Sequence, residues 1–274
     1  MISKKMENMV ANSSAIRAMF EEGNRLAKIY GPENVFDFSL GNPNVPAPKA
    51  VKQAILDILD EEDELVLHGY TNSNAGYEDV RQAVAESLNE RFGTAFAAKN
   101  ITMTVGAAGG LNVILKALLN PGDEVLIPQP SYVSYLPCVT LADGVPVIIE
   151  LEEKDQFKLT PEKLLEKITD KTKILVLPFP NNPTGAIMEK HELKEIAKIV
   201  IEKDLFVVTD EIYSELTYQR KHATIAAFPG MKERTVLING FSKSYAMTGW
   251  RLGYAAAPDL ILKQMLKIHQ YAIM

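Results

Sequence analysis

Five polar side chains in the second half of the chain have complementary chemistry. Lys243 offers an amine, Asp210 a carboxylate and Tyr213 a phenol. Asn182 adds an amide, and Arg251 places a guanidinium eight residues beyond Lys243. An amine can form an imine with an aldehyde, a carboxylate can keep a ring nitrogen protonated, and a fixed cation can hold a phosphate. Each residue type also occurs for structural reasons, but together they fit one site for an aldehyde-bearing, phosphorylated cofactor.

Two turns could hold parts of such a site. The small-residue turn GAAGG at 106–110 opens a helical pattern, so backbone N–H groups there could face an anion such as phosphate. The turn at 178–185 contains three prolines and a glycine, which could hold the Asn182 amide in one place. Either turn alone could equally be a packing device. With Lys243 and Asp210 they meet the requirements of a pyridoxal phosphate site, whereas a dinucleotide site would need no such lysine.

The elements that must position these residues alternate along the chain. Segments with helical spacing, such as 110–119 and 189–203, separate short apolar runs at 101–105, 124–127, 146–149, 173–177, 205–209 and 235–238. This pattern predicts a three-layer α/β/α domain with a mainly parallel sheet covered by helices on both faces. Open sheets of this kind bind ligands outside the carboxyl ends of their strands, where the polar residues would meet.

The two ends of the chain do not show this alternation of strands and helices. A helix is expected over 13–30, capped by Ser13 and Ser14, followed by an extended connector over 38–48. A last helix is expected from residue 258 to the end. We therefore expect an N-terminal helix and connector over residues 1–45 and a large domain over residues 46–274.

Composition excludes several classes of protein. The chain has 274 residues, a formal net charge of -6 and a single cysteine, Cys138. The acidic balance offers no general attraction to nucleic acid or to an anionic membrane surface, and no run approaches the ~18 apolar residues that span a bilayer. No cysteine or histidine spacing suggests a metal site. We expect a cytoplasmic protein.

Three motifs carry a family resemblance. The segment GFSKSYAMTGWRLG at 240–253 closely resembles the lysine-attachment signature of class I and II pyridoxal-phosphate-dependent aminotransferases, which share the aspartate aminotransferase fold. The segments NNPTG at 181–185 and TDEIY at 209–213 occur in the same order and at similar separations as in that family. The resemblance extends over essentially the whole chain.

The resemblance implies roles at the centre of the site. Lys243 would form the Schiff base with the cofactor and then shuttle a proton between the substrate's α-carbon and the cofactor. Asp210 would pair with the pyridinium nitrogen, while Asn182 and Tyr213 would hydrogen-bond the cofactor's phenolic oxygen. Asn182 would also border the substrate.

The resemblance also implies roles for residues around the cofactor's phosphate, its ring face and the substrate. Phosphate would be held by Ser242, Arg251 and the backbone of Gly106, Ala107 and Ala108. Tyr132 would stack on the cofactor ring, although it could equally be plain core. Tyr70 would reach the phosphate of a neighbouring subunit, which makes a homodimer the expected assembly, and Gly41 would close over the substrate.

Two departures from the family pattern stand out. Ala107 and Ala108 replace hydroxyl residues of some relatives and Gly240 replaces a serine, so phosphate binding should depend more on Arg251 and backbone donors. The resemblance implies that residues 1–45 are the N-terminal piece of a small domain. Family members continue well beyond this length, through the rest of that small domain, which supplies a carboxylate-binding arginine. We therefore expect a truncated chain in which the C-terminal small domain is absent and turnover is impaired.

Three functions stay open on these residues. The leading hypothesis is an aminotransferase that moves an amino group from an L-amino acid to a 2-oxo acid by ping-pong exchange. A carbon–sulfur β-lyase of the same fold shares the lysine, aspartate and arginine. A non-catalytic domain that binds pyridoxal phosphate is the third. The donor amino acid is open, because pocket shape sets side-chain selectivity.

Overall fold

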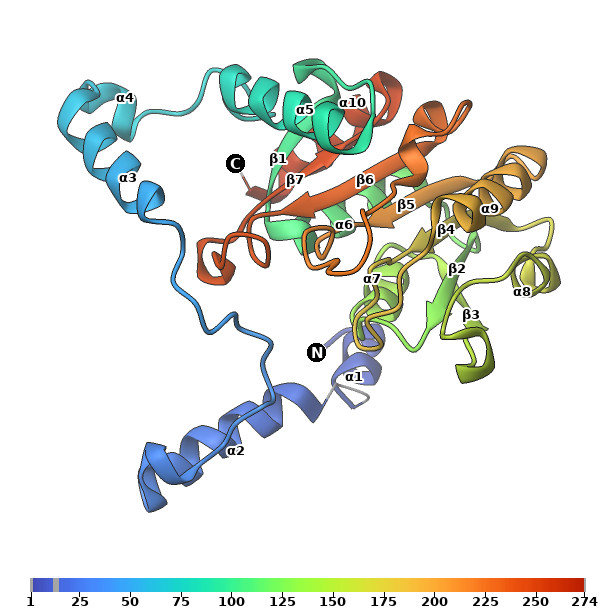
Figure 1. Ribbon diagram of the computed structural model, residues 1–274, viewed down its shortest axis with the longest axis horizontal. Helices are drawn as coiled ribbons and strands as arrows, with labels where there is room; N and C mark the ends of the chain where they lie inside the picture. The colour runs from blue at the N-terminus through green and yellow to red at the C-terminus, as the bar shows by residue number, and fades with distance from the viewer. Residues whose placement is uncertain (1, 12–14, 274) are drawn as a thin grey trace. The chain divides into compact units, whose positions relative to one another are not determined.

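Within residues 2–11 and 15–273, the part of the chain that the computed structural model describes, seven strands form one mixed sheet (Figure 1). They are β1 (Ile101–Val105), β2 (Glu124–Gln129), β3 (Val145–Glu150), β4 (Thr172–Leu177), β5 (Phe206–Asp210), β6 (Thr235–Gly240) and β7 (Leu252–Ala256). Their order across the sheet is β1-β7-β6-β5-β4-β2-β3. β7 runs antiparallel to both of its neighbours, and the other pairs are parallel.

The three-layer prediction is confirmed, with one strand more than expected. All six predicted runs form strands, but β7 was missed, because its sequence LGYAA has no β-branched residue. The helices are α3 (Lys49–Glu61), α4 (Glu64–His68), α5 (Glu78–Phe92), α6 (Gly106–Leu118), α7 (Tyr135–Leu141), α8 (Pro161–Lys167), α9 (Lys190–Glu202) and α10 (Asp259–Ile273). The predicted helices at 110–119, 189–203 and 258–274 correspond to α6, α9 and α10.

Alternating side chains of the strands divide the core between the two faces of the sheet. Val125 and Ile127 of β2 pack with α6, α7 and α10, whereas Leu126 points into a second cluster with α8 and α9. A third cluster joins α5 to β1, β6 and β7 on that second face. Burial on both faces explains the near-continuous apolar character of the central strands.

The chain divides into two units, Met1–Asn44 and Val45–Met274. The first contains α1 (Lys4–Ala11) and α2 (Ala15–Tyr30), and α2 confirms the helix predicted there. The expected caps Ser13 and Ser14 lie outside the described residues. The predicted connector is confirmed, since 35–48 contains no helix or strand. That the first unit is a piece of a small domain stays a prediction.

None of the helices in the described ranges combines the length and the apolar character that crossing a bilayer requires.

Three glycines allow β7 to lie close to the start of α6. Gly240 pairs with Gly253 in the sheet, and a Cβ on Gly240 would lie 2.9 Å from the Gly253 Cα. A Cβ on Gly253 would lie 2.5 Å from the Gly106 carbonyl carbon and 2.6 Å from the Ala107 nitrogen. The glycine at 240, noted as a departure from some relatives, is therefore required by this packing.

Replacing Gly253 by alanine tests this contact. The added methyl group would push against backbone, which cannot turn away, so we expect Gly253→Ala to lower the free energy of unfolding by about 1–3 kcal/mol. Gly249→Ala is the matched control, because a Cβ there meets nothing within 4 Å. Urea denaturation would measure both, and equal midpoints for the two variants would contradict the packing.

Candidate active site

The sequence-predicted residues of the large unit, Tyr70 excepted, gather at one edge of the sheet. β1 and β6 both run antiparallel to β7, so the carboxyl ends of β1, β2, β4, β5 and β6 share this edge. Asp210 ends β5, while Lys243 and Ser242 follow β6 and Asn182 follows β4. Arg251 precedes β7, and because that strand is reversed, its start reaches the same edge.

Asp210 is held by two hydrogen bonds from the protein. The Tyr135 hydroxyl donates to its Oδ2 at 2.8 Å, and the Ile212 amide donates to its Oδ1 at 3.2 Å. Burial raises the pKa of the Asp210 carboxyl, and the Tyr135 hydrogen bond opposes that rise. Burial also raises the pKa of the Tyr135 phenol, which keeps it a proton donor. Asp210 is therefore a fixed acceptor in a site that disfavours an uncompensated charge.

Tyr135 is the site residue that the sequence reasoning missed. It lies in the PSYVSY segment three residues after Tyr132, at the start of α7. The two rings pack edge to face, with centroids 5.6 Å apart and an interplanar angle of 85°. Tyr132 itself is 39% exposed, which leaves it accessible at the edge. Its stacking on a cofactor stays a prediction.

Lys243 lies beside a linked amide and phenol. The Asn182 side-chain amide donates to the Tyr213 hydroxyl at 3.2 Å, and Lys243 Nζ is 5.9 Å from the centre of the Tyr213 ring. Burial, and to a lesser degree the charge of Arg251, lower the pKa of the Lys243 amine. A lowered pKa increases the neutral fraction of an amine, and the neutral form is the nucleophile.

The start of α6 and Arg251 lie against each other. The Gly106 amide donates to the Arg251 carbonyl at 2.8 Å, and a Cβ on Gly106 would lie 2.5 Å from Arg251 Nη2. Gly106 has φ of +65°, which glycine adopts readily. The guanidinium thus lies against the helix N-terminus, where Ala107 and Ala108 follow and where anions are favoured.

Two predicted residues do not join this group. Tyr70 follows α4 and is 90% exposed. Gly41 belongs to the first unit. Their predicted roles, toward a neighbouring subunit and toward substrate, stay predictions.

Replacing Tyr135 by phenylalanine tests the electrostatics of Asp210. The hydrogen bond from Tyr135 stabilises the ionised carboxylate, so its loss should raise the Asp210 pKa further. Carbon-13 NMR of the apo protein would measure this pKa. A raised pKa means that the folded form holds the proton more tightly than the unfolded chain. The free energy of unfolding therefore falls as the pH rises from the Asp210 pKa of the unfolded chain to the Asp210 pKa of the folded protein. In Tyr135→Phe this fall should continue to a higher pH.

Tyr132→Phe is the matched control for that measurement. It removes a neighbouring hydroxyl that, among the described residues, makes no hydrogen bond to Asp210. An Asp210 pKa that falls in Tyr135→Phe, or that moves equally in both variants, would contradict the assignment.

The chain matches known proteins over most of its length. The family model described as aminotransferase class I and II matches residues 33–274. An aspartate aminotransferase of Pyrococcus abyssi is 39% identical over 96% of this chain, and an aromatic-amino-acid aminotransferase of Thermococcus litoralis is 38% identical over 98%. The chain covers 65% and 67% of these two relatives.

Solved structures agree with the sequence relatives. The aspartate aminotransferase of Rhizobium meliloti superposes with a TM-score of 0.91 at 30% identity, covering 100% of this chain and 67% of that structure. Across four similar relatives the chain spans between 60% and 65% of their length. On the family match and these identities, the chain belongs to the aminotransferase class I and II family.

Proposed function

We propose that this protein is a pyridoxal-phosphate-dependent aminotransferase that transfers an amino group from an L-amino acid to a 2-oxo acid by ping-pong exchange. The observation that carries the proposal is the position of Lys243, an amine with a lowered pKa, beside Tyr213 at the sheet edge that also presents Asp210. Family membership supports the same chemistry.

The residues present fit the cofactor. Asp210 is a half-buried carboxylate with a raised pKa, and a cation placed against it, such as a protonated ring nitrogen, would offset the cost of its ionisation. The start of α6 at Gly106 and the adjacent Arg251 guanidinium suit a phosphate. Ser242, which directly precedes Lys243, offers a further hydroxyl donor. When bound, pyridoxal 5′-phosphate supplies an electron sink for negative charge at the substrate α-carbon.

Each residue of the centre has a distinct task. Lys243 would hold the cofactor through its amine and would carry a proton to and from the substrate α-carbon as general base and acid. Asp210, whose orientation is fixed by the Tyr135 hydroxyl, would keep a proton on the ring nitrogen. Asn182 and Tyr213, which are hydrogen-bonded to each other, would donate to the phenolic oxygen, and Asn182 would also border the substrate.

The periphery orients the cofactor and excludes water. Backbone N–H groups of Ala107 and Ala108, with Arg251 and Ser242, would hold the phosphate, and Gly106, whose own N–H is bonded to the Arg251 carbonyl, would keep Arg251 at the start of α6. Tyr132 covers one face of the ring.

We also assign a homodimeric assembly in the cytoplasm. Helices α3 and α4 have no buried residue, and they carry exposed apolar side chains, with Leu65 83% and Leu59 60% exposed. An exposed apolar surface of this kind suits a subunit interface. Tyr70, just beyond α4, would then reach the phosphate of the second subunit.

Reductive labelling tests the assignment of Lys243. We expect borohydride reduction of the protein with pyridoxal phosphate to attach a pyridoxyl group to Lys243, located by peptide mass spectrometry. Lys243→Ala should abolish the label, whereas Lys154→Ala, at a lysine whose side chain is 70% exposed, should retain it. Labelling elsewhere, or none in the unmodified protein, would contradict the assignment.

Substrate assays test the reaction. With aspartate and then aromatic amino acids as donors, suggested by the names of the relatives, we expect 2-oxoglutarate to be converted into glutamate. Asp210→Asn should lower kcat by at least about 100-fold, since the ring nitrogen loses its acidic partner. Release of pyruvate and sulfide from cystathionine without amino transfer would instead identify a β-lyase.

A further inference from the structure

The end of β5 carries a buried cluster on the side opposite Asp210. Glu211 is 1% exposed, and its Oε1 accepts hydrogen bonds from Thr209 Oγ1 at 3.0 Å and Thr224 Oγ1 at 2.6 Å. Its Oε2 lies 2.7 Å from His222 Nε2. Side chains alternate along an extended chain, so a carboxylate bonded to Thr209 lies behind Asp210. The site described above does not use this cluster.

His222 is held from a second side by α5. Its side chain is 7% exposed, and its ring packs edge to face on Phe92, with centroids 5.1 Å apart and an interplanar angle of 84°. A ring confined in this way can present Nε2 in only a narrow range of directions. Glu211 is therefore bonded to a group that is itself fixed by the fold.

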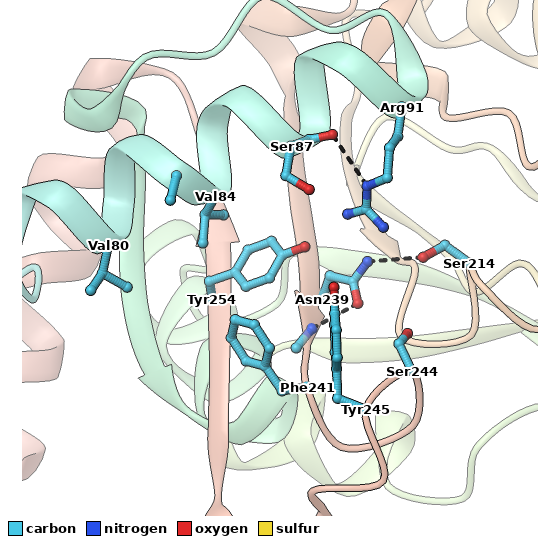
Figure 2. A pocket seen from close by; sticks show the side chains of 12 residues that line it. Val80, Val84, Ser87, Arg91, Ser214, Asn239, Phe241, Ser244, Tyr245 and Tyr254 are labelled. Atoms are coloured by element: carbon cyan, nitrogen blue, oxygen red, sulfur yellow. Dashed lines mark hydrogen bonds between the residues drawn. The ribbon is translucent and has the colours of Figure 1, made fainter. Parts of the chain in front are cut away.

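The backbone of the same turn is tied to β6. The Glu211 amide donates to the Ile238 carbonyl at 2.9 Å, and the Ser214 amide donates to the Glu211 carbonyl at 2.9 Å. Asn239 then bridges the turn to the strand: its amide donates to Ser214 Oγ at 3.2 Å, and its Oδ1 accepts the Gly240 amide at 2.7 Å (Figure 2).

This bridge borders a cavity of about 310 Å³ beneath α5 (Figure 2). The strand it braces leads directly to Lys243. Glu211 consequently lies at the junction between the segment that bears Asp210 and the segment that bears the lysine.

We propose that Glu211 and His222 form a positioning pair that fixes the Asp210 carboxylate in its place relative to Lys243. The role rests on the proposed function, since Asp210 is the group that would meet the cofactor ring. Neither residue contacts the reacting atoms in this role. Outer-sphere partners of this kind set the orientation of the groups that do.

Hydrogen exchange in the apo protein reads the position of Asp210 directly, because the Ile212 amide donates to Asp210 Oδ1. We expect His222→Ala to speed exchange at Ile212 by about tenfold, as a donor to a buried carboxylate is lost, with a smaller change at Val208 in the middle of β5. His222→Gln, whose amide nitrogen can stand near the position of Nε2, should restore most of the protection. His191→Ala, at a histidine whose side chain is 76% exposed, is the matched control.

The dissociation constant of pyridoxal phosphate gives the second measurement. We expect His222→Ala to weaken binding by about tenfold and His222→Gln to recover it. Unchanged exchange at Ile212 in His222→Ala would overturn the pairing. So would an equal acceleration at Ile212 and Val208, which would mark loosening of the whole strand.

Failure of the proposed function and failure of the variant to fold can each be told apart from failure of the positioning role. If the unmodified protein binds no pyridoxal phosphate, the proposed function fails, while exchange at Ile212 still decides the positioning. If His222→Ala does not fold, Thr224→Val removes another donor to Glu211 at nearly equal volume, and the same comparison of Ile212 with Val208 applies.

Discussion

The close approach of β7 to the start of α6 is the constraint on which the site depends. Gly240 and Gly253 face each other across the sheet, and Gly253 in turn lies against the backbone of Gly106 and Ala107. No side chain fits between these segments. β7 can therefore enter the sheet in the reversed direction next to the strand that leads to Lys243, and Arg251 comes to the edge where the other strands end.

Burial then sets the electrostatics of that edge. It raises the pKa of Asp210 and lowers the pKa of Lys243, so both groups are moved toward their neutral forms. A cation next to the carboxylate would stabilise its ionised form, and an aldehyde would react with the neutral amine. The fixed donors from Tyr135 and from the Ile212 amide already hold Asp210 in one orientation, which lowers the reorganisation needed when that partner arrives.

Most of the framework was predictable from the sequence because apolar runs and helical periodicity report burial directly. The strands at 101–105 and 173–177 are examples, and the residues of the three motifs fall at the expected edge. β7 was missed, since three of its five residues are glycine or alanine and none is β-branched. Tyr135 was missed for another reason, because it lies 75 residues from its partner Asp210 and only the fold brings them together. The pair of Glu211 and His222, eleven residues apart, was missed because the segment between them has no periodic pattern that would place the two side chains together.

The central claim is that the carboxylate at the end of β5 keeps a proton on the ring nitrogen of a cofactor bound at Lys243. Nitrogen-15 NMR of ring-labelled pyridoxal phosphate bound to the protein measures that proton directly. The account predicts a protonated nitrogen at neutral pH in the unmodified protein and an unprotonated one in Asp210→Asn. An unprotonated ring nitrogen in the unmodified protein at neutral pH would contradict it.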